Sequence, residues 1–398
     1  MSADVNLEKL YEFSALYFAL PTPKFRRYLF DRIDFAAKMI GILGQRGVGK
    51  TTLIRQMAQH VNLPSNKVLY ISADNIENSL SEIAVAFSAY GGELLIVDEV
   101  HKAPDFAKEI KKIYDFLNIR VILSGSSALE LHNSKTDLSR RVLFYELHSL
   151  SFREFLAIGF DMPLPVLTLE DILKHHQEIA SELKRSFKPL ELWAEYKQYG
   201  AYPFFTEGKL GYSLRLNEIV NIILDSEVAL IYHVNSDKIS TIRKLLHLLC
   251  SAVPVELNIQ NIAKSAGLSR NTLYSYLYYL QKANLIEIIG GNFSNKKLLN
   301  KPDKIYLDNV NLYNILCSDK NSGSLRESFF VSQVKIDHSV KYAQKGDFIV
   351  DDRYTFEIGG KNKSFRQIEG IDNSYLALDG IETGFGAKIP LWMFGMMY

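Results

Sequence analysis

A glycine-rich loop between two apolar segments constrains the fold of this chain more than any other feature of its sequence. Residues 44–51 read Gly-Gln-Arg-Gly-Val-Gly-Lys-Thr, which matches a phosphate-binding loop at every required position. The apolar residues 39–43 before the loop are typical of a buried strand, and residues 52–58 after it have the pattern of an amphipathic helix. Strand, loop and helix in this order turn backbone N–H groups toward an anion at the positive end of a helix.

The side chains at the end of this loop predict a site for a nucleoside triphosphate with magnesium. We expect Lys50 to reach the β- and γ-phosphates and the hydroxyl of Thr51 to bind Mg²⁺. The residues predicted to bind the nucleotide are Gly44, Gln45, Arg46, Gly47, Val48, Gly49, Lys50, Thr51, Thr52 and Asp98.

A second motif, an apolar run that ends in two carboxylates, supports the first. Residues 94–97 are all apolar, which suits a strand buried on both faces of a parallel sheet. Asp98 and Glu99 follow at its carboxyl end, where open α/β sheets bind ligands. We expect Asp98 to hold the metal and Glu99 to polarise the attacking water as general base. Two such carboxylates are often only solvated loop charges, but a complete phosphate loop upstream favours a nucleotide hydrolase.

Composition limits the other possibilities. A chain of 398 residues is long enough for two to four domains, and its formal charge of +1 identifies neither nucleic acid nor an anionic membrane as a partner. Two cysteines, Cys250 and Cys317, provide no disulfide framework and no metal-ligand cluster. The N-terminus has no secretory signal pattern, and the apolar run 389–397 is too short to span a bilayer. We therefore expect a soluble, cytoplasmic protein without a membrane partner.

The order of the predicted elements indicates an α/β protein with a parallel sheet. Strand patterns alternate with helical ones in its first part, as a parallel sheet requires; the strands are predicted at residues 39–43, 68–72, 94–97, 121–126 and 142–147. We expect an N-terminal helix at 1–20, a P-loop core at 21–150, a helical lid at 151–240, a winged helix at 241–298 and a small α/β module at 299–398.

The winged helix is predicted from a helix, a glycine turn, a second helix and an apolar strand. Residues 259–268 form the first helix and turn, Ser269 caps the second helix at 270–283, and residues 285–289 before Gly290-Gly291 resemble the first wing strand. Four polar residues of the second helix can reach DNA phosphates or base edges: Arg270, Asn271, Thr272 and Ser275.

The same helix also carries features that argue against DNA binding. It has few cations, although phosphate contacts normally dominate affinity for DNA, and it contains four tyrosines. Both a DNA contact and a packing role for this element therefore stay open.

With these motifs the chain resembles the AAA-like P-loop ATPases of bacteria and archaea that carry a C-terminal winged helix and a nuclease-like region. The resemblance extends over nearly the whole chain. Besides the two nucleotide motifs it rests on the sequences Ile-Leu-Ser-Gly-Ser-Ser-Ala-Leu-Glu-Leu, Leu-Ser-Arg-Arg-Val, His-Ser-Leu-Ser-Phe-Arg-Glu-Phe and Phe-Glu-Ile-Gly-Gly-Lys-Asn-Lys. It implies ATP as the nucleotide and Mg²⁺ as the metal, since a phosphate loop alone leaves the base unspecified.

The resemblance also implies further catalytic residues. Ser126, at the end of the fourth predicted strand, stands where related ATPases have a polar sensor of the γ-phosphate. Arg140 and Arg141 stand where such proteins have an arginine finger, which acts in trans and would require self-association. The alternative for Ser126 is an ordinary turn serine, and the alternative for the two arginines is a pair of surface ion pairs.

The C-terminal module resembles the core of PD-(D/E)xK nucleases, in which two carboxylates bind magnesium and a lysine assists the attacking water. Asp347 and Glu357 match that pattern, and Glu327 lies at a suitable helix position. The lysine departs from it, because Gly359 stands at the expected position and Lys361 follows two residues later. Either Lys361 replaces the lysine or the site is inactive, and we favour a module kept for packing or nucleic-acid contact.

Three functions remain open from the sequence. The chain is an ATP-binding and ATP-hydrolysing protein that acts as a nucleotide-gated switch on DNA, an ATPase scaffold that binds a protein partner, or an ATP-dependent nuclease. We rank them in this order, because the two nucleotide motifs are complete and the nuclease-like motif is not.

Overall fold

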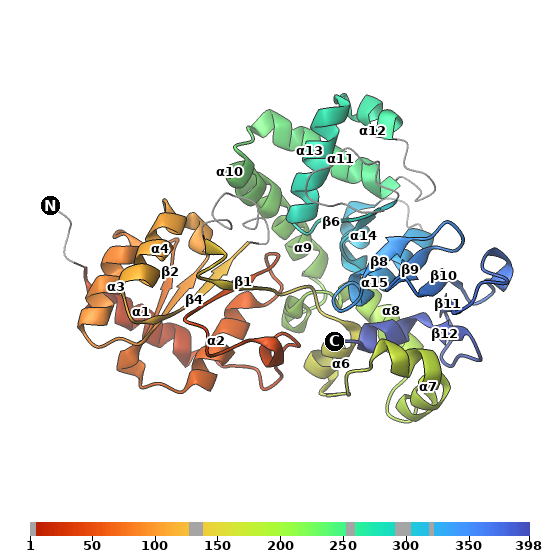
Figure 1. Cartoon of the computed structure of the whole chain (residues 1–398), viewed down its shortest axis with the longest axis horizontal. Helices are drawn as coiled ribbons and strands as arrows, with labels where there is room; N and C mark the ends of the chain where they lie inside the picture. The colour runs from red at the N-terminus through yellow and green to blue at the C-terminus, as the bar shows by residue number, and fades with distance from the viewer. Residues whose placement is uncertain (1–4, 127–137, 252–258, 291–303, 318–321) are drawn as a thin grey trace. The chain divides into compact units, whose positions relative to one another are not determined.

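A computed structural model describes residues 5–126, 138–251, 259–290, 304–317 and 322–398. The chain divides into two compact units, residues 1–148 and 149–398 (Figure 1). The predicted turn of the wing at Gly291 and part of the sequence motif at residues 122–131 lie outside the described residues.

The first unit is built on a five-stranded sheet in which every pairing is parallel. The strand order is β2-β3-β4-β1-β5, so β1 lies between β4 and β5. The α/β class and the predicted strands are confirmed, and the strands are β1 (Met39–Leu43), β2 (Val68–Ser72), β3 (Leu94–Asp98), β4 (Arg120–Gly125) and β5 (Leu143–Glu146).

Helices pack against this sheet and bury its apolar residues (Figure 1). Ser79 precedes α3 (Leu80–Ala89) as its N-cap and forms a capping box, in which its hydroxyl accepts from the N–H of Glu82 and the Glu82 carboxylate accepts from the N–H of Ser79. The sheet and helices share a core that includes Leu69, Leu95 and Ile110. The helices are α1 (Leu7–Ala19), α2 (Lys50–Val61), α3 (Leu80–Ala89) and α4 (Phe106–Phe116), with 3-10 turns at Phe30–Arg32, Ser65–Lys67 and Val100–Lys102.

The second unit begins with the helical region that the sequence predicts. Its core is rich in aromatic rings, among which Trp193 packs edge-on against Phe329 with ring centroids 4.3 Å apart. The elements are α6 (Phe152–Phe160), α7 (Leu169–Leu183), α8 (Pro189–Tyr199), a 3-10 turn (Pro203–Glu207), α9 (Tyr212–Ile222), a π-helical turn (Ile223–Val228), α10 (Ala229–Tyr232) and α11 (Ser236–Ser251).

The predicted packed turn at residues 200–204 is held by one buried asparagine. The Asn311 side-chain oxygen accepts from the N–H of Ala201 at 2.7 Å, and its amide nitrogen donates to the carbonyls of Tyr196 and Lys197. Because Asn311 lies in the first turn of the helix α14 (Val310–Leu316), it fixes the end of α8 to α14.

A helix-turn-helix and a hairpin follow α11 in the order that the sequence predicts. Ser269 caps the second helix by accepting from the N–H of Thr272 at 3.2 Å. The two strands of the hairpin are antiparallel, with Ile286 opposite Leu307. The elements are α12 (Ile259–Ala266), α13 (Arg270–Lys282), β6 (Ile286–Ile289) and β7 (Lys304–Leu307).

The end of the chain forms a second five-stranded sheet, which is mixed. Its order is β12-β11-β10-β9-β8, with β10, β11 and β12 parallel and with β9 antiparallel to both β8 and β10. The apolar residues 391–397, which lie in and beside a 3-10 helix (Leu391–Met396), are buried. The elements are α15 (Ser322–Val334), β8 (Val340–Tyr342), β9 (Phe348–Val350), β10 (Tyr354–Gly360), a 3-10 turn (Phe365–Gln367), β11 (Ser374–Asp379) and β12 (Lys388–Pro390).

The two cysteines form a disulfide, so the expectation that they provide no disulfide framework was wrong. Cys250 near the end of α11 is bonded to Cys317 after α14, with the Cα atoms 5.5 Å apart and 67 positions apart in sequence. Two isolated cysteines at such a separation have no spacing pattern that could predict their pairing. In the part of the chain that the structure describes, every helix is too short or too polar to cross a lipid bilayer.

We expect reduction of this disulfide to lower the stability of the second unit. Closing a loop of 67 residues lowers the conformational entropy of the unfolded chain. In the chain-entropy treatment this raises the free energy of unfolding by about 4 kcal/mol. The measurement is the melting temperature with and without reductant, with the Cys250→Ala/Cys317→Ala variant as the control that reductant leaves unchanged. Alkylation of two thiols in protein unfolded without reductant would contradict the prediction.

Candidate nucleotide-binding site

The phosphate loop connects β1 to α2, and its glycines take conformations that other residues avoid. Gly47 has φ 84° and Gly49 has φ 100°, both in the left-handed region. Gly49 is also the N-cap of α2, which begins at Lys50. A Cβ atom at Gly44 would lie 2.5 Å from the carbonyl oxygen of Leu147. The backbone of this loop therefore requires the glycine spacing that predicts a phosphate site.

Lys50 is buried and folded back on the loop. Its ammonium donates to the carbonyl of Gly44 at 2.9 Å and to that of Gln45 at 3.2 Å. These partners are neutral dipoles, so an anionic phosphate in the loop would attract the ammonium more strongly than they do. Thr51, the next residue, donates from its hydroxyl to Asp98 at 3.0 Å.

Asp98 is the centre of the site and is almost fully buried. Its Oδ2 accepts from the hydroxyls of Thr51 and Tyr70, each at 3.0 Å. Its Oδ1 accepts from the hydroxyl of Ser124 and from the N–H of Glu99 at 3.1 Å. Four donors fix the carboxylate in one orientation beside the Thr51 hydroxyl. Hard oxygen ligands at this spacing fit the preference of Mg²⁺.

Ser124 and Tyr70 were missed by the sequence analysis, because their role depends on strand order. In the register of the parallel pair, Val97 on β3 lies opposite Leu123 on β4. The next residues on the two strands, Asp98 and Ser124, therefore lie next to each other. Ser72 on the other neighbour, β2, lies opposite Asp98. The signal in the sequence was a polar residue near the carboxyl end of each neighbouring strand. Ser126, which the resemblance implied, is buried after the end of β4.

Glu99 has an unusual backbone conformation for a residue with a side chain. Its φ is 54°, and such left-handed positions cost about 1–3 kcal/mol unless the surroundings hold them. Its N–H is held by Asp98 and by the Ser124 hydroxyl at 3.0 Å. The strain thus coincides with the residue expected to be the general base.

His101 is the side-chain neighbour of Glu99. Its Nε2 lies 3.4 Å from Oε2 of Glu99, and only 3% of the imidazole is exposed. Burial lowers the pKa of His101 and outweighs the opposite effect of the Glu99 carboxylate. The lowered pKa keeps the imidazole neutral at pH 7, and its Nε2 faces the Glu99 carboxylate.

A pair of stacked tyrosines joins α1 to the site. The rings of Tyr17 and Tyr70 lie parallel, with centroids 3.6 Å apart. The Tyr17 hydroxyl donates to the carbonyl of Thr51 at 2.7 Å. Burial raises the pKa of both hydroxyls, so they keep their protons and act as donors. No local motif marks Tyr17, since it comes from the N-terminal helix.

Arg27 holds the phosphate loop from its other side. Its guanidinium is buried and donates to the carbonyl of Val48 at 2.7 Å and to that of His148 at 2.8 Å. These bonds tie the loop to the segment after β5. Arginines in the irregular segment before β1 have no pattern that predicts such a contact, and this one was missed.

The two arginines proposed as fingers differ in their surroundings. Arg141 makes a two-point ion pair with Asp115, at 2.9 Å from Nε and 3.1 Å from Nη2. The side chain of Arg140 is exposed. Since Arg141 already has a carboxylate partner in its own chain, Arg140 is the better candidate for a finger offered to another subunit.

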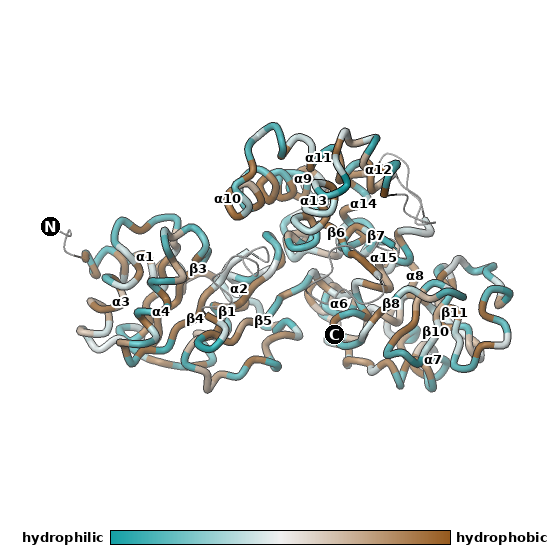
Figure 2. Tube along the Cα trace, turned by 45° about the horizontal axis from the view of Figure 1, so that its top comes forward, coloured by the Kyte–Doolittle hydropathy of each residue, from teal (hydrophilic) through white to brown (hydrophobic). Residues whose placement is uncertain are grey.

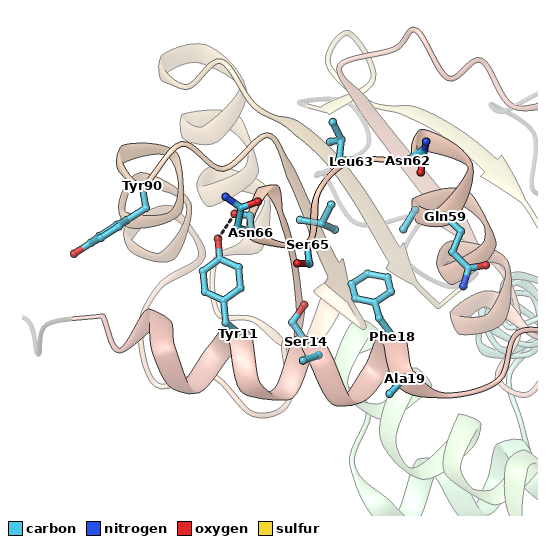
Figure 3. Close-up of a pocket in the computed structure, with 13 residues that line it drawn as sticks. Tyr11, Ser14, Phe18, Ala19, Gln59, Asn62, Leu63, Ser65, Asn66 and Tyr90 are labelled. Carbon is cyan, nitrogen blue, oxygen red and sulfur yellow. Dashed lines mark hydrogen bonds between the residues drawn. The ribbon is translucent and has the colours of Figure 1, made fainter.

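A groove of about 920 Å³ lies apart from the phosphate loop, between α1 and the end of α2. Figure 3 shows Tyr11, Ser14 and Phe18 of α1 on one side of it, and Asn66 on the other. The Tyr11 hydroxyl donates to the carbonyl of Asn66 at 2.7 Å, which ties α1 to the turn before β2. The described residues that line this groove include none of the loop residues 44–51.

The four residues predicted to contact DNA lie at the start of α13. Arg270, Asn271 and Ser275 are exposed, and Thr272 is half-buried. Tyr274 and Tyr276, two of the four tyrosines that argued against DNA binding, are buried at 7% and 6% exposure, and the Arg270 guanidinium donates to the Tyr274 hydroxyl at 3.4 Å. Much of the aromatic content of α13 therefore belongs to the core, and its exposed start is polar (Figure 2).

The nuclease-like residues of the C-terminal module are surrounded by lysines. Glu327 and Asp347 both pair with Lys304 of β7, each at 2.8 Å. Glu357 pairs with Lys363, while Lys361 is exposed. That Lys361 replaces the missing lysine stays a prediction; the lysine that reaches Glu357 is Lys363, two residues further along the chain. Among the residues that the structure describes, no group of three acidic, histidine or cysteine side chains could hold a metal.

Comparisons with known proteins agree with the nucleotide-binding motifs found in the first unit. Residues 36–156 match the family model of an AAA domain, and residues 190–322 match that of a domain of unknown function (DUF8612). An uncharacterized protein of Methanocaldococcus jannaschii, MJ1637, is 26% identical over 387 residues, which cover 88% of this chain and 82% of that protein.

Solved structures align only loosely with the chain. A point mutant of RuvB from Thermotoga maritima covers 76% of this chain and 92% of its own, with 16% identity and a TM-score of 0.28. The ORC1 protein of Aeropyrum pernix in complex with DNA covers 80% of this chain and 94% of its own, with 12% identity and a TM-score of 0.30. The phosphate loop, the parallel sheet and the family match together show that residues 36–156 carry an AAA-type P-loop domain.

Proposed function

We propose that the first unit binds ATP with Mg²⁺ and hydrolyses it, and that the nucleotide state controls when the second unit engages DNA. The observation that carries the ATPase proposal is the fixed Asp98 carboxylate between Thr51 and Glu99. Adenine as the base is supported by the similarity of residues 36–156 to AAA domains.

Each side chain of the site would have a distinct task. Lys50 would leave the loop carbonyls and bind phosphate oxygens, to which the loop N–H groups would also donate. Thr51 and Asp98 would hold Mg²⁺, which when bound neutralises phosphate charge and orients the γ-phosphate. Glu99 would orient the attacking water and accept its proton. Arg140 from another copy of the chain would supply positive charge to the transition state.

We expect Glu99→Gln to bind ATP as the wild type does and to hydrolyse it about 10²–10⁴ times more slowly, because the amide cannot accept the proton. Lys50→Ala should lose nucleotide binding. Single-turnover hydrolysis of radiolabelled ATP and equilibrium binding measure the two effects separately. The matched control is Glu93→Gln, at a partly exposed carboxylate just before the same strand, where it pairs with Lys67. Unchanged turnover in Glu99→Gln would exclude Glu99 as the base.

His101 supports the same step, because its imidazole lies against the Glu99 carboxylate. We expect His101→Ala to lower kcat about ten- to a hundredfold, because the Glu99 carboxylate loses a buried polar neighbour; this is the rate equivalent of about 1.5–3 kcal/mol. The KM for ATP should change little, since His101 has no expected contact with the nucleotide. His101→Gln should restore part of the rate. A change confined to KM would contradict this role.

DNA binding by the second unit is supported by the exposed polar start of α13. We expect Arg270→Ala to weaken DNA retention and to reduce the salt slope of log K by roughly one, as the loss of one phosphate contact does. Fluorescence anisotropy with duplex DNA, with ATP and without nucleotide, measures the effect. Arg215→Ala, at an exposed arginine of α9, is the control. Absence of DNA retention in both nucleotide states would favour a protein partner for this surface.

A further inference from the structure

The acidic residues of the C-terminal module converge on one lysine that comes from a different element. Lys304 opens β7 of the hairpin, Glu327 lies on α15, and Asp347 immediately precedes β9. The Lys304 ammonium lies 2.8 Å from Oε2 of Glu327 and 2.8 Å from Oδ1 of Asp347. The three side chains are 10%, 13% and 16% exposed. The ammonium therefore sits between two carboxylates in a largely water-excluded position.

The carboxylate oxygens of this cluster have further donors. The Tyr306 hydroxyl donates to the same oxygen of Glu327 that pairs with Lys304. Oδ2 of Asp347 accepts from the N–H of Ile358 at 2.8 Å. Burial alone would lower the pKa of Lys304, but the two carboxylates outweigh it and raise the pKa, so the lysine stays charged. A cation that approached these carboxylates would have to displace a fixed ammonium.

Glu357, the remaining acidic residue of the nuclease-like motif, has its own lysine. Its carboxylate pairs with Lys363, and the residue is 1% exposed. This contact depends on Gly359, because a Cβ atom there would lie 2.6 Å from side-chain carbons of Lys363. The glycine that breaks the expected motif thus leaves room for Lys363 to lie across the strand and reach Glu357.

Two ammonium groups therefore neutralise most of the charge on three carboxylates. Divalent cations are bound where carboxylate charge is uncompensated and oxygens converge on a vacant position. At this site the position shared by Glu327 and Asp347 is filled by Lys304, and a divalent cation beside it would be repelled by that ammonium. The donor set does not fit the magnesium that a nuclease-like fold implies.

We propose that Lys304 takes the place of a divalent cation in this module, which makes the acidic cluster an ionic joint and not a metal-dependent cleavage site. The joint fastens the β6–β7 hairpin to α15 and to the segment before β9. A second ion pair also joins the hairpin to α15. Lys335, just after α15, pairs with Glu287 of β6 at 2.5 Å and with Asp308, just after β7, at 3.2 Å. The hairpin and the C-terminal sheet thereby form one cooperative block.

The test is thermal unfolding of the full chain, without nucleotide, in the presence and absence of MnCl₂. Lys304→Met leaves two buried carboxylates without a counter-charge and should lower the Tm by roughly 6–12 °C. Manganese should raise the Tm of this variant and leave that of the wild type unchanged. Adding Asp347→Asn to Lys304→Met should abolish the response to manganese. The matched control is Lys341→Met, which removes a partly exposed lysine paired with Asp352 and should change neither quantity.

Measurements on the wild type decide the proposal even if Lys304→Met does not fold. The proposal is overturned if manganese stabilises the wild type but not Asp347→Asn, or if the wild type nicks DNA in a metal-dependent way that Asp347→Asn abolishes. It is supported if neither occurs and if a triple variant has a higher Tm than Lys304→Met. That triple variant is Lys304→Met/Glu327→Gln/Asp347→Asn, which leaves neither of the two buried carboxylates without a counter-charge. None of these outcomes depends on ATP hydrolysis by the first unit.

Discussion

The orientation of one buried carboxylate determines the geometry of the nucleotide site. Asp98 accepts four hydrogen bonds, from α2, β2, β4 and its own strand end. Such a convergence is possible because parallel strands end at the same edge of the sheet and because β3 lies between β2 and β4. The same bonds place the N–H of Glu99, which fixes a backbone conformation that is otherwise unfavourable. Glu99, the proposed general base, is therefore oriented through Asp98 beside it.

The contacts of Asp98 also extend to the N-terminal helix. Tyr70 donates to Asp98 and stacks on Tyr17, and Tyr17 donates to the first turn of α2. Any ligand that binds to Thr51 or Asp98 would change the hydrogen bonds that Tyr70 and Tyr17 donate there. Helix α1 is thus joined to the phosphate site by hydrogen bonds and a ring stack, while its other end is held by the bond between Tyr11 and Asn66.

The features that could be predicted from sequence are those set by short segments. The glycines at 47 and 49 take left-handed conformations that the local loop demands, and the apolar run at 94–97 is buried because a parallel sheet covers both faces. Ser124, Tyr70 and Arg27 could not be predicted, because each acts on a partner that only strand order or the path of an approach segment brings near. For the same reason the lysine partners of the nuclease-like carboxylates could not be predicted. Lys363 reaches Glu357 from beyond a glycine, and Lys304 comes from a separate hairpin.

Two buried lysines of this chain show how the partners of an ammonium determine what it can do. Lys50 is held by two backbone carbonyls, whose partial charges an incoming phosphate exceeds, so the lysine can move to a ligand. Lys304 is held by two carboxylates in a largely buried position. Its release would leave two buried negative charges without a counter-charge, which would lower the stability of the fold strongly. The first arrangement suits a site that binds and releases an anion. The second suits a permanent joint, and it explains how an acidic cluster that resembles a metal site in sequence has most of its charge neutralised without a metal.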